Sequence, residues 1–504
     1  HRIARRQRQM CIRDRLILKN YCNNFYMEFG YKKMYVGGKL IEGELITKSN
    51  VICPANGKPI AQIAQAGKID AENALNSAKN GFKYWSKLSL DERTKWMLKL
   101  RDAVIEKEHI LRLSIVYEMG KTYDAAIEDI EAVTNALEWY PNAMKNLRDE
   151  QIPDYENTHT HKMIQHPAGV VVAYLAWNFP LLNVGFKLGP ALASGCSIII
   201  KPSPLSPLSA YVLGEILHDI DFPPGVVNIL SGPTEEVATT LSKSKIPAVL
   251  TMIGSTATGQ KVIKDSATSI KRLSMELGGN APFIVFEDAD IEKALDLAIA
   301  LKFGNSGQIC VAANRFFIHS SIYEIFLKKY LERVKKIKLG FGINEKPDMG
   351  PMITKKDRDR MFVLIDDAIK KGGILLAGGK IPKGKEEGNW IQPTVISEMT
   401  TEMLLFKEET FGPIAPFMKF VNDDDVLSLA NDTEYGLASY IFTNNNQRIQ
   451  RFSEELSFGE VQVNGVKYAI YLPHGGIKNS GIGHDCSHLA LEDYLVKKRV
   501  SIAL

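Results

Sequence analysis

The segment Ala248-Val-Leu-Thr-Met-Ile253 is an apolar run, and Gly254-Ser-Thr-Ala-Thr-Gly259 follows it as a glycine-bounded turn. A helical stretch through Lys261, Val262 and Ile263 comes next, so this part of the chain predicts a strand, a turn and a helix. The backbone N–H groups at the start of such a helix can hold a phosphate. The turn is not a GxGxxG motif, however, and a purely structural turn is the alternative interpretation.

The same alternation of apolar runs and helical stretches extends to both sides of this segment. Such alternation is typical of a parallel sheet with crossover helices. Residues 69–148 have the three- and four-residue apolar spacing of helices. Further strands are expected at 170–176, 197–200, 226–230 and 283–286.

A second set of elements begins near residue 300 and predicts a second α/β domain. A helix is expected at 291–303 and another after Ser321, which would be its N-cap. The other expected elements are strands at 315–319, 437–443 and 460–464 and a helix at 426–430. The predicted fold class is therefore α/β, with two parallel-sheet domains.

Composition excludes several classes of protein. The chain has 504 residues, of which 45% are hydrophobic and 24% charged, as in folded globular proteins and unlike disordered ones. Its six cysteines occur singly, with no CxxC pair and no histidines at zinc-binding spacing, which favours reduced thiols and no structural metal. No apolar run is long enough to span a bilayer, so we expect no membrane-embedded body.

The basic residues gather in a leader at the N-terminus. Residues 1–26 hold seven basic residues and one acidic residue, and the rest of the chain is close to neutral, which leaves no basic face for nucleic acid. The leader, residues 1–33, is expected to be disordered or foreign to the fold. The protein is expected in the cytoplasm. A mitochondrial targeting segment is the alternative. Met27 or Met34 would begin the folded protein, and Met34 opens a hairpin pattern with a Gly-Gly turn.

Cys310 is the cysteine whose surroundings best suit a reactive thiol. It lies in the small polar loop Asn305-Ser-Gly-Gln-Ile-Cys310, whereas Cys196 lies in an apolar run and Cys11 and Cys22 belong to the leader. A lone cysteine is more often structural, so Cys310 needs partner residues before it can be assigned as a nucleophile.

Three polar residues close to predicted strands are candidate partners. Lys201 ends an apolar strand, where a ribose or a phosphate could bind, although a solvated lysine is the alternative. Glu276 lies between Met275 and Leu277, where a buried carboxylate needs either a role or an ion pair. Asn178 offers an amide donor, although Asn before Phe179-Pro180 is also ordinary turn chemistry.

Eight motifs, in this order and spacing, resemble those of the aldehyde dehydrogenase superfamily over residues 34–504. They are Trp177-Asn-Phe-Pro180, Gly189-Pro-Ala-Leu192 with Gly195-Cys196, Lys201-Pro-Ser203, Gly254-Ser-Thr-Ala-Thr-Gly259, Met275-Glu-Leu-Gly-Gly279, Gly307-Gln-Ile-Cys310, Glu408-Glu-Thr-Phe-Gly-Pro413 and Gly475-Gly-Ile-Lys-Asn-Ser-Gly481.

The resemblance implies an oxidoreductase that converts an aldehyde to a carboxylic acid with NAD or NADP. Cys310 would attack the carbonyl carbon, and the Asn178 side chain with the Cys310 N–H would hold the thiohemiacetal oxyanion. After hydride transfer, Glu276 would activate the water that hydrolyses the thioester. No metal is implied. The implied cofactor-binding residues are Trp177, Lys201, Ser203, Gly232, Gly254, Ser255, Gly259, Glu409 and Phe411.

The family's fold implies Rossmann-like domains and a bridging arm that pairs strands between subunits, hence a homodimer or homotetramer. The cofactor domain would comprise 34–148 and 168–278, and the catalytic domain 279–478. The arm would comprise 149–167 and 479–504.

The chain departs from the family pattern at several positions. Pro204 replaces a Glu common in NAD-specific members, so repulsion of an NADP 2′-phosphate is absent, and Ala176 and His474 replace a usual Pro and a common Phe. The amino-acid sequence resembles that of the succinate-semialdehyde dehydrogenase branch. The positions at which that branch holds the substrate carboxylate with arginine align near Phe186 and Gly304, and neither residue can pair a charge. A broader aldehyde dehydrogenase is therefore favoured. A succinate-semialdehyde enzyme, a coenzyme A-acylating relative and a catalytically silent homologue are the alternatives.

Overall fold

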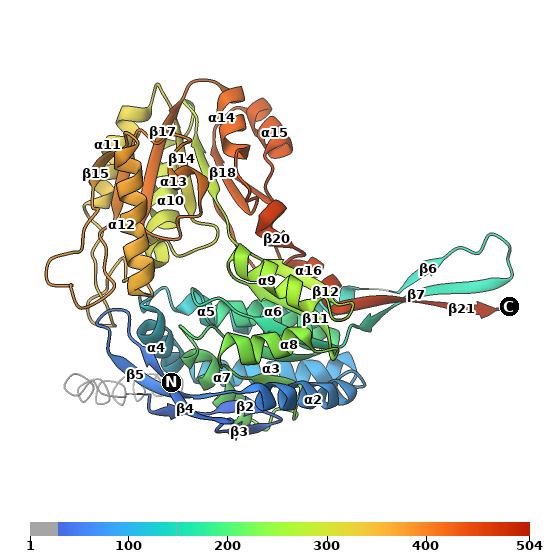
Figure 1. The fold of residues 1–504 in the computed structure, drawn as a ribbon. Helices are drawn as coiled ribbons and strands as arrows, with labels where there is room; N and C mark the ends of the chain where they lie inside the picture. The colour runs from blue at the N-terminus through green and yellow to red at the C-terminus, as the bar shows by residue number, and fades with distance from the viewer. Residues whose placement is uncertain (1–28, 148) are drawn as a thin grey trace, which may run out of the picture.

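The computed structural model describes residues 29–147 and 149–504. It consists of two α/β bodies, each built on a central sheet, and a thin arm that projects from the first body (Figure 1). Mixed α/β architecture with largely parallel sheets confirms the predicted fold class. Within the described residues, no helix is long and apolar enough to cross a membrane.

The first sheet has five parallel strands at its centre and antiparallel strands at both edges. Its central strands are almost entirely apolar because helices cover both faces of the sheet. Residues 170–174, for example, are all buried. In spatial order the strands are β20 (Gly481–Ile482), β12 (Arg272–Glu276), β11 (Pro247–Ile253), β8 (Val170–Tyr174), β9 (Ser197–Lys201), β10 (Val227–Ile229), β2 (Met34–Val36) and β3 (Lys39–Ile41).

The helices of the first body include the predicted helical region 69–148, which forms four separate helices. The second of these begins with a capping box in which Ser89 and Glu92 bond each other's backbone N–H groups. The helices are α2 (Lys68–Trp85), α3 (Leu90–Glu106), α4 (Glu108–Met119), α5 (Ile127–Asn146), α6 (Leu182–Ser194), α7 (Leu208–Asp219), α8 (Thr239–Lys243), α9 (Thr256–Ser266) and α16 (Ser487–Tyr494), with a π-helical turn, η1 (Thr234–Ala238).

The second sheet is parallel except at one edge, where β15 runs antiparallel to β16. Alternate residues of one inner strand, 281–285, face different cores: Phe283 and Val285 pack in one cluster and Ile284 in another, so both faces of the sheet are covered. In spatial order the strands are β15 (Ile374–Ala377), β16 (Thr394–Ser397), β17 (Ile414–Phe420), β14 (Ala313–His319), β13 (Ala281–Val285), β18 (Ala438–Phe442) and β19 (Glu460–Val463).

The helices of the second body follow the predicted order, with one correction. Ser321 is not an N-cap: the helix begins at Tyr323, its N-cap is Ile322, and the Ser321 hydroxyl instead contacts Nδ1 of His319 at 2.8 Å. The helices are α10 (Ile291–Phe303), α11 (Tyr323–Val334), α12 (Lys355–Lys370), α13 (Leu404–Lys407), α14 (Asp423–Asn431) and α15 (Asn446–Glu455), with short 3₁₀ turns η2 (Gly304–Gly307) and η3 (Lys478–Ser480).

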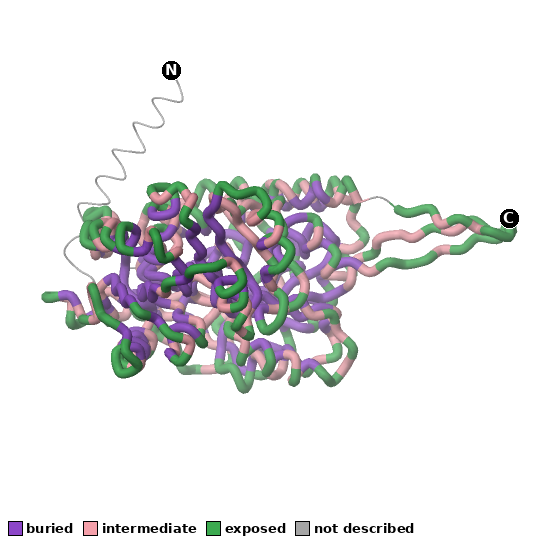
Figure 2. Tube along the Cα trace, turned by 90° about the horizontal axis from the view of Figure 1, so that it is seen from above, coloured by how far each residue is buried: buried purple, intermediate pink, exposed green. Residues whose placement is uncertain are grey.

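The arm is a three-stranded antiparallel sheet of β6 (Glu150–Ile152), β7 (His159–Pro167) and β21 (Leu495–Ala503). It stands away from the body and is largely exposed along its length (Figure 2). Its second segment is shorter than the expected 479–504. Residues 481–482 pair with β12, and α16 packs against α6, because Ala490, Leu491 and Tyr494 are apolar and belong to the first core.

The ordered fold begins before residue 34, which corrects the C-terminal limit of the expected leader. Phe29 is buried, and β1 (Tyr31–Lys32) pairs with β5 (Pro59–Gln65), which also pairs with β4 (Leu45–Ile52). An ion pair of 2.8 Å between Lys32 and Glu215 adds to this attachment. The rest of the leader, with Cys11 and Cys22, lies outside the described residues.

Candidate active site

A cleft of about 1370 Å³ lies between the two bodies. Its walls include the carboxyl ends of parallel strands of the first sheet, where open α/β sheets bind ligands. Most of the predicted site residues line it together, although they come from distant parts of the chain: Trp177, Asn178, Lys201, Ser203, Gly254, Ser255, Glu276, Cys310, Glu409 and Phe411.

Gly232 and Gly259 are predicted cofactor contacts that do not line this cleft. A Cβ at Gly232 would lie 2.2 Å from the carbonyl oxygen of Ala66, and one at Gly259 would lie 2.7 Å from Leu277. Close packing of backbone against neighbouring atoms therefore accounts for both glycines.

The loop that carries Cys310 has an unusual backbone. Asn305, Ser306 and Gly307 all have positive φ angles, of 49°, 59° and 71°. A Cβ at Gly307 would lie 2.3 Å from the carbonyl oxygen of Gly412, so only glycine fits there. The side chain of buried Gln308 ties the loop to its neighbours by accepting a 2.9 Å hydrogen bond from the Ile353 N–H. These contacts hold the Cys310 loop in one position.

Asn178 lies in the turn between β8 and α6 and is 5% exposed. Its Nδ2 donates to the carbonyl of Gln308 at 3.1 Å, and Nδ2 of Asn305 donates to the Asn178 carbonyl at 3.0 Å. These bonds place the Asn178 amide beside the Cys310 loop. An amide NH₂ has a second hydrogen to donate, so one donor can serve an oxyanion.

Asp129 of α5 holds the turn that follows Asn178. Its Oδ1 accepts the N–H groups of Leu181 and Leu182 at 3.0 Å, and its Oδ2 accepts from Lys121 at 2.6 Å in a fully buried ion pair. The sequence does not reveal this role of Asp129, because a carboxylate in the first turn of a helix is common.

Glu276 ends β12 and is 4% exposed. Gly279, three residues on, lies directly against the Cys310 loop, because a Cβ there would be 2.3 Å from the carbonyl oxygen of Cys310. The Met275-Glu-Leu-Gly-Gly279 motif therefore brings a carboxylate and the Cys310 loop together by close backbone contact.

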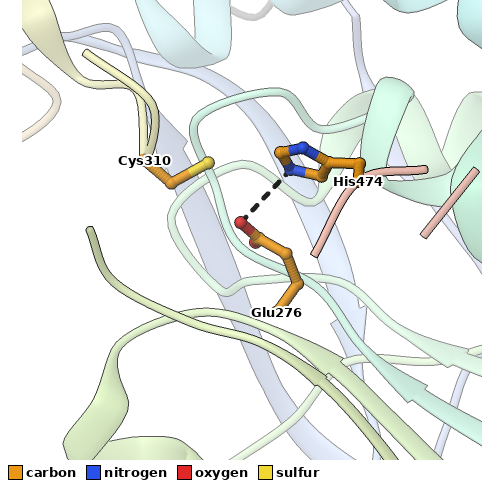
Figure 3. Close-up of side chains that lie close together, drawn as sticks. All are labelled: Glu276, Cys310 and His474. Atoms are coloured by element: carbon orange, nitrogen blue, oxygen red, sulfur yellow. Dashed lines mark ion pairs between the residues drawn. The ribbon is translucent and has the colours of Figure 1, made fainter. Parts of the chain in front are cut away.

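Figure 3 shows the side chains of Cys310, Glu276 and His474 converging on one point. The Sγ, a carboxylate oxygen and an imidazole nitrogen all lie within 4.8 Å of one another. Nε2 of His474 lies 3.4 Å from Oε1 of Glu276, and Nδ1 lies 2.6 Å from Oε1 of Glu460. The sequence identifies His474 only as a departure from the family pattern, and it carries no signal for Glu460.

The surroundings of Cys310 have opposing effects on the pKa of its thiol. Burial raises the pKa of Cys310, and the Glu276 carboxylate raises it further, whereas the contact with His474 lowers it. His474 is thus the neighbour that favours the thiolate.

One side of the cleft contains a helix N-terminus and a buried lysine. Ser255 is the N-cap of α9, and its Oγ accepts from the Thr258 N–H. Lys201 is buried at the end of β9, and burial lowers its pKa to about 8. No described carboxylate lies within ion-pair distance of Lys201, so an anionic or hydroxyl-bearing ligand could bind its ammonium group. Beside it, the Ser203 hydroxyl accepts from the Leu205 N–H at 3.2 Å.

Glu409 and Phe411 occupy the opposite wall of the cleft. Oε1 of Glu409 accepts the Gly279 N–H at 2.9 Å, and burial raises the pKa of this carboxyl to about 7. The Phe411 ring contacts Trp177 edge to face, with centroids 5.3 Å apart. A Cβ at Gly278 would lie 2.8 Å from Glu409, so glycine keeps this wall open.

Known proteins resemble this chain over most of its length. Residues 41–500 match the sequence profile described as "Aldehyde dehydrogenase family". The mitochondrial succinate-semialdehyde dehydrogenase of Oryza sativa is 37% identical to this chain over 469 residues, which are 92% of this chain and 88% of that protein.

Solved structures share the fold over almost the whole chain. An NADP-dependent enzyme of E. coli has a TM-score of 0.92 at 34% identity, covering 94% of this chain and 98% of its own. Betaine aldehyde dehydrogenase of Staphylococcus aureus, solved with NAD+, has a TM-score of 0.91 at 32% identity, covering 95% of this chain and 96% of its own.

Proposed function

The chain belongs to the aldehyde dehydrogenase family, and on that premise we propose that Cys310, Asn178 and Glu276 carry out the family's reaction, oxidation of an aldehyde to the carboxylic acid. This assignment rests on the convergence of three side chains in one cleft. A thiol, a buried amide and a buried carboxylate from three separate segments meet at one end of one cleft. These are the groups that nucleophilic attack, oxyanion stabilisation and water activation require.

In the first half of the reaction, the sulfur of Cys310 attacks the aldehyde carbon. The S–C bond forms as the carbonyl electron pair moves to oxygen, and Nδ2 of Asn178 donates to that oxyanion. Asn178 is preorganised for this because its amide is already fixed against the Gln308 carbonyl. Loss of hydride from the same carbon leaves a thioester on Cys310.

The cleft also fits a nicotinamide dinucleotide, NAD or NADP, which supplies the hydride acceptor when bound. The α9 N-terminus at Ser255 suits a pyrophosphate, buried Lys201 with Ser203 suits the adenine-side ribose, and Glu409 suits the nicotinamide ribose. We assign the edge of the nicotinamide to Phe411. The related solved structures include both an NADP-dependent enzyme and one solved with NAD+.

In the second half, Glu276 takes a proton from water, whose oxygen attacks the thioester carbon. Collapse of the tetrahedral adduct breaks the S–C bond and releases the acid. A buried carboxylate close to Sγ favours hydrolysis over transfer to coenzyme A. Product analysis with and without coenzyme A separates the two reactions, because acyl transfer would give an acyl-coenzyme A instead of the free acid.

For the substrate, we favour aldehydes without a carboxylate, although relatives such as the Oryza sativa enzyme are named for succinate semialdehyde. Arg360 is the one arginine among the described residues that line the cleft, and its guanidinium already bonds Thr410, Glu409 and Glu408. Phe186, near a position where the semialdehyde enzymes hold arginine, is apolar. Initial rates with matched aliphatic, aromatic and carboxylated aldehydes test this preference.

The nucleophile is tested with Cys310→Ala, for which Cys486→Ala is the matched control, because Cys486 is also a free cysteine lining the cleft. Cys310→Ala should abolish aldehyde oxidation and leave cofactor binding nearly unchanged, and the control should retain turnover. Aldehyde oxidation by Cys310→Ala at a rate near that of the unmodified enzyme would refute the assignment.

We also propose that the arm joins subunits into a homodimer or homotetramer. Strand β21 is an edge strand of the arm and carries exposed residues, so its backbone groups are available to pair with another copy. Light scattering on the full chain and on a variant ending at residue 494 tests this. A variant that keeps the oligomer would show that the arm is not the interface.

The cytoplasm is the proposed compartment, and the mitochondrion is the alternative if the basic leader acts as a targeting segment. A C-terminal fluorescent fusion, imaged with and without residues 1–26, distinguishes the two. Mitochondrial signal that requires those residues would favour the alternative.

A further inference from the structure

His474 lies between two carboxylates in the part of the site that binds the aldehyde. Nδ1 lies 2.6 Å from Oε1 of Glu460, and Nε2 lies 3.4 Å from Oε1 of Glu276. The Sγ of Cys310 lies within 4.8 Å of a carboxylate oxygen of Glu276 and of an imidazole nitrogen of His474 (Figure 3). The imidazole therefore links Glu460 to the nucleophile.

The surrounding structure fixes the imidazole in this orientation. The backbone of His474 forms a two-way bridge with Asp485, whose carboxylate pairs with buried Lys187. The ring lies 6.3 Å from that of Phe186 and 5.9 Å from that of Tyr468, centroid to centroid. A side chain held by its backbone and by two rings has few other rotamers available.

The contacts of its two ring nitrogens favour the charged form of His474: Nδ1 forms a hydrogen bond with Glu460, and Nε2 lies at ion-pair distance from Glu276. A neutral imidazole has one N–H, whereas an imidazolium has two, and here both ring nitrogens face carboxylate oxygens. No lysine or arginine within the described residues pairs with Glu460, and its Oε2 is buried without a hydrogen-bond partner. A cation on His474 is thus the nearest compensation for the Glu460 charge.

We propose that His474, held by Glu460, is an imidazolium that stabilises the Cys310 thiolate, so that the site contains a Cys310–His474–Glu460 triad in addition to the general base. This inference rests on the proposed role of Cys310 as nucleophile. An imidazole nitrogen of His474 lies within 4.8 Å of the Sγ of Cys310. Glu460 is a positioning residue that acts through His474.

The proton balance of the triad is simple. The Cys310 thiol gives its proton to the solvent before the sulfur attacks, and the two N–H protons stay on His474. When sulfur attacks the aldehyde carbon, the imidazolium keeps both protons. When water hydrolyses the thioester, sulfur leaves again as a thiolate beside the same cation, and the proton from water goes to Glu276. The cation therefore favours sulfur as nucleophile and as leaving group.

The electrostatic balance around His474 agrees with this geometry. Burial lowers the pKa of His474, but its bonds to Cys310, Glu276 and Glu460 outweigh burial and raise that pKa well above its usual range. The other charged or titratable groups near it include Asp485, Lys187, Cys486, Tyr440 and Tyr468. Asp485 and Lys187 pair with each other, so the carboxylates of Glu276 and Glu460 dominate.

The test is the pH dependence of Cys310 alkylation by iodoacetamide in the full chain without cofactor. The rate is read from the tryptic peptide that carries Cys310, with Cys310→Ala as the blank. In His474→Phe, the midpoint of the alkylation profile should move up by about one pH unit or more, because a thiol loses its stabilising cation. At pH 7 that shift is about a tenfold slower alkylation. Glu460→Gln should move the midpoint in the same direction by less.

Tyr468→Phe is the matched control, because it keeps the ring beside His474 and removes only a hydroxyl that bonds Tyr440. Its midpoint should equal that of the unmodified enzyme. Should His474→Phe fold poorly, His474→Gln provides the same uncharged comparison. An unchanged midpoint in the folded His474 variant would overturn the triad. Because alkylation needs no turnover, that result would leave the role of Cys310 itself to be decided by the activity of Cys310→Ala.

Discussion

The two ends of the cleft are built in different ways. At the cofactor end, β11, the turn at Gly254 and α9 form one continuous stretch of chain. Lys201 ends β9 of the same sheet, with β8 between β9 and β11. At the catalytic end, Asn178, Glu276, Cys310 and His474 come from four separate segments. Local geometry therefore makes the turn at Ser255. Tertiary packing makes the catalytic end, and it also brings Glu409 and Phe411 to the cofactor end. Single substitutions should accordingly have large effects at the catalytic end and graded effects at the cofactor end.

Glu276→Gln should give the largest loss among the substitutions considered next. Attack and hydride transfer should still occur, because neither needs this base, and hydrolysis should stall. We expect a burst of reduced cofactor close to one equivalent per site, followed by a steady rate lower by about 10²- to 10⁴-fold. Stopped-flow absorbance of the reduced nicotinamide measures both phases.

Glu131→Gln is the control for that experiment, since Glu131 lines the same cleft but lies on α5. It should show no burst and a near-normal rate. A normal steady-state rate in Glu276→Gln would show that Glu276 is structural.

Asn178→Ala should lower kcat by about 10²- to 10³-fold, because a preorganised donor to the oxyanion is lost. Cofactor affinity should be nearly unchanged. Steady-state kinetics with a saturating cofactor measure the loss. Asn183→Ala is the matched control: it removes a buried amide that lines the same cleft but bonds the Ala176 carbonyl, at 3.1 Å. Equal losses in the two variants would indicate a packing effect in place of an oxyanion contact.

Lys201→Met should weaken NADP binding by about tenfold, which corresponds to loss of about 1.4 kcal/mol. The pKa of Lys201 is lowered to about 8, so the ammonium charge is present below pH 8 and lost as the pH rises through that value. The dissociation constant for NADP should therefore increase between pH 7 and pH 9 in the unmodified enzyme. Titration of tryptophan fluorescence with NADP at each pH measures it.

Two further variants are controls for the Lys201 experiment. In Lys201→Arg the pH dependence should flatten, because a guanidinium stays charged throughout this range. Lys467→Met, at another position of the cleft lining, should leave NADP binding unchanged. A pH dependence that survives in Lys201→Arg would assign it to another group.

Pro204→Glu should have the smallest effect, a shift of about fivefold in the ratio of kcat/KM for NAD to that for NADP. Pro204 is exposed, so repulsion between a carboxylate there and a 2′-phosphate is close to its value in water, about 1 kcal/mol at 4 Å. The shift should shrink at high salt. Pro204→Gln, which changes shape without charge, should leave the ratio near its original value, and an equal shift in both variants would exclude the electrostatic explanation.

Much of the fold could be predicted from local pattern. The apolar runs at 170–176, 197–200 and 226–230 are strands of one parallel sheet because a sheet buried on both faces needs continuous apolar residues. Ser255 caps α9 because its side chain and the turn before it are adjacent in sequence. The N-cap prediction at Ser321 was wrong, because the side chain of His319 bonds the hydroxyl that would have capped the helix. A competing side chain of this kind is not visible in a capping pattern.

The amino-acid sequence alone predicts which residue types can do the chemistry, a thiol, an amide and a carboxylate, because those capacities belong to the side chains themselves. Their distances depend on contacts between remote segments. Gly279 lies against Cys310, Asp129 holds the turn after Asn178, and Asp485 holds the backbone of His474. The sequence marks His474 as unusual, but only the tertiary structure places its ring between Glu276 and Glu460. The charge state of a buried imidazole depends on such neighbours, and these neighbours meet only when the two bodies are folded together.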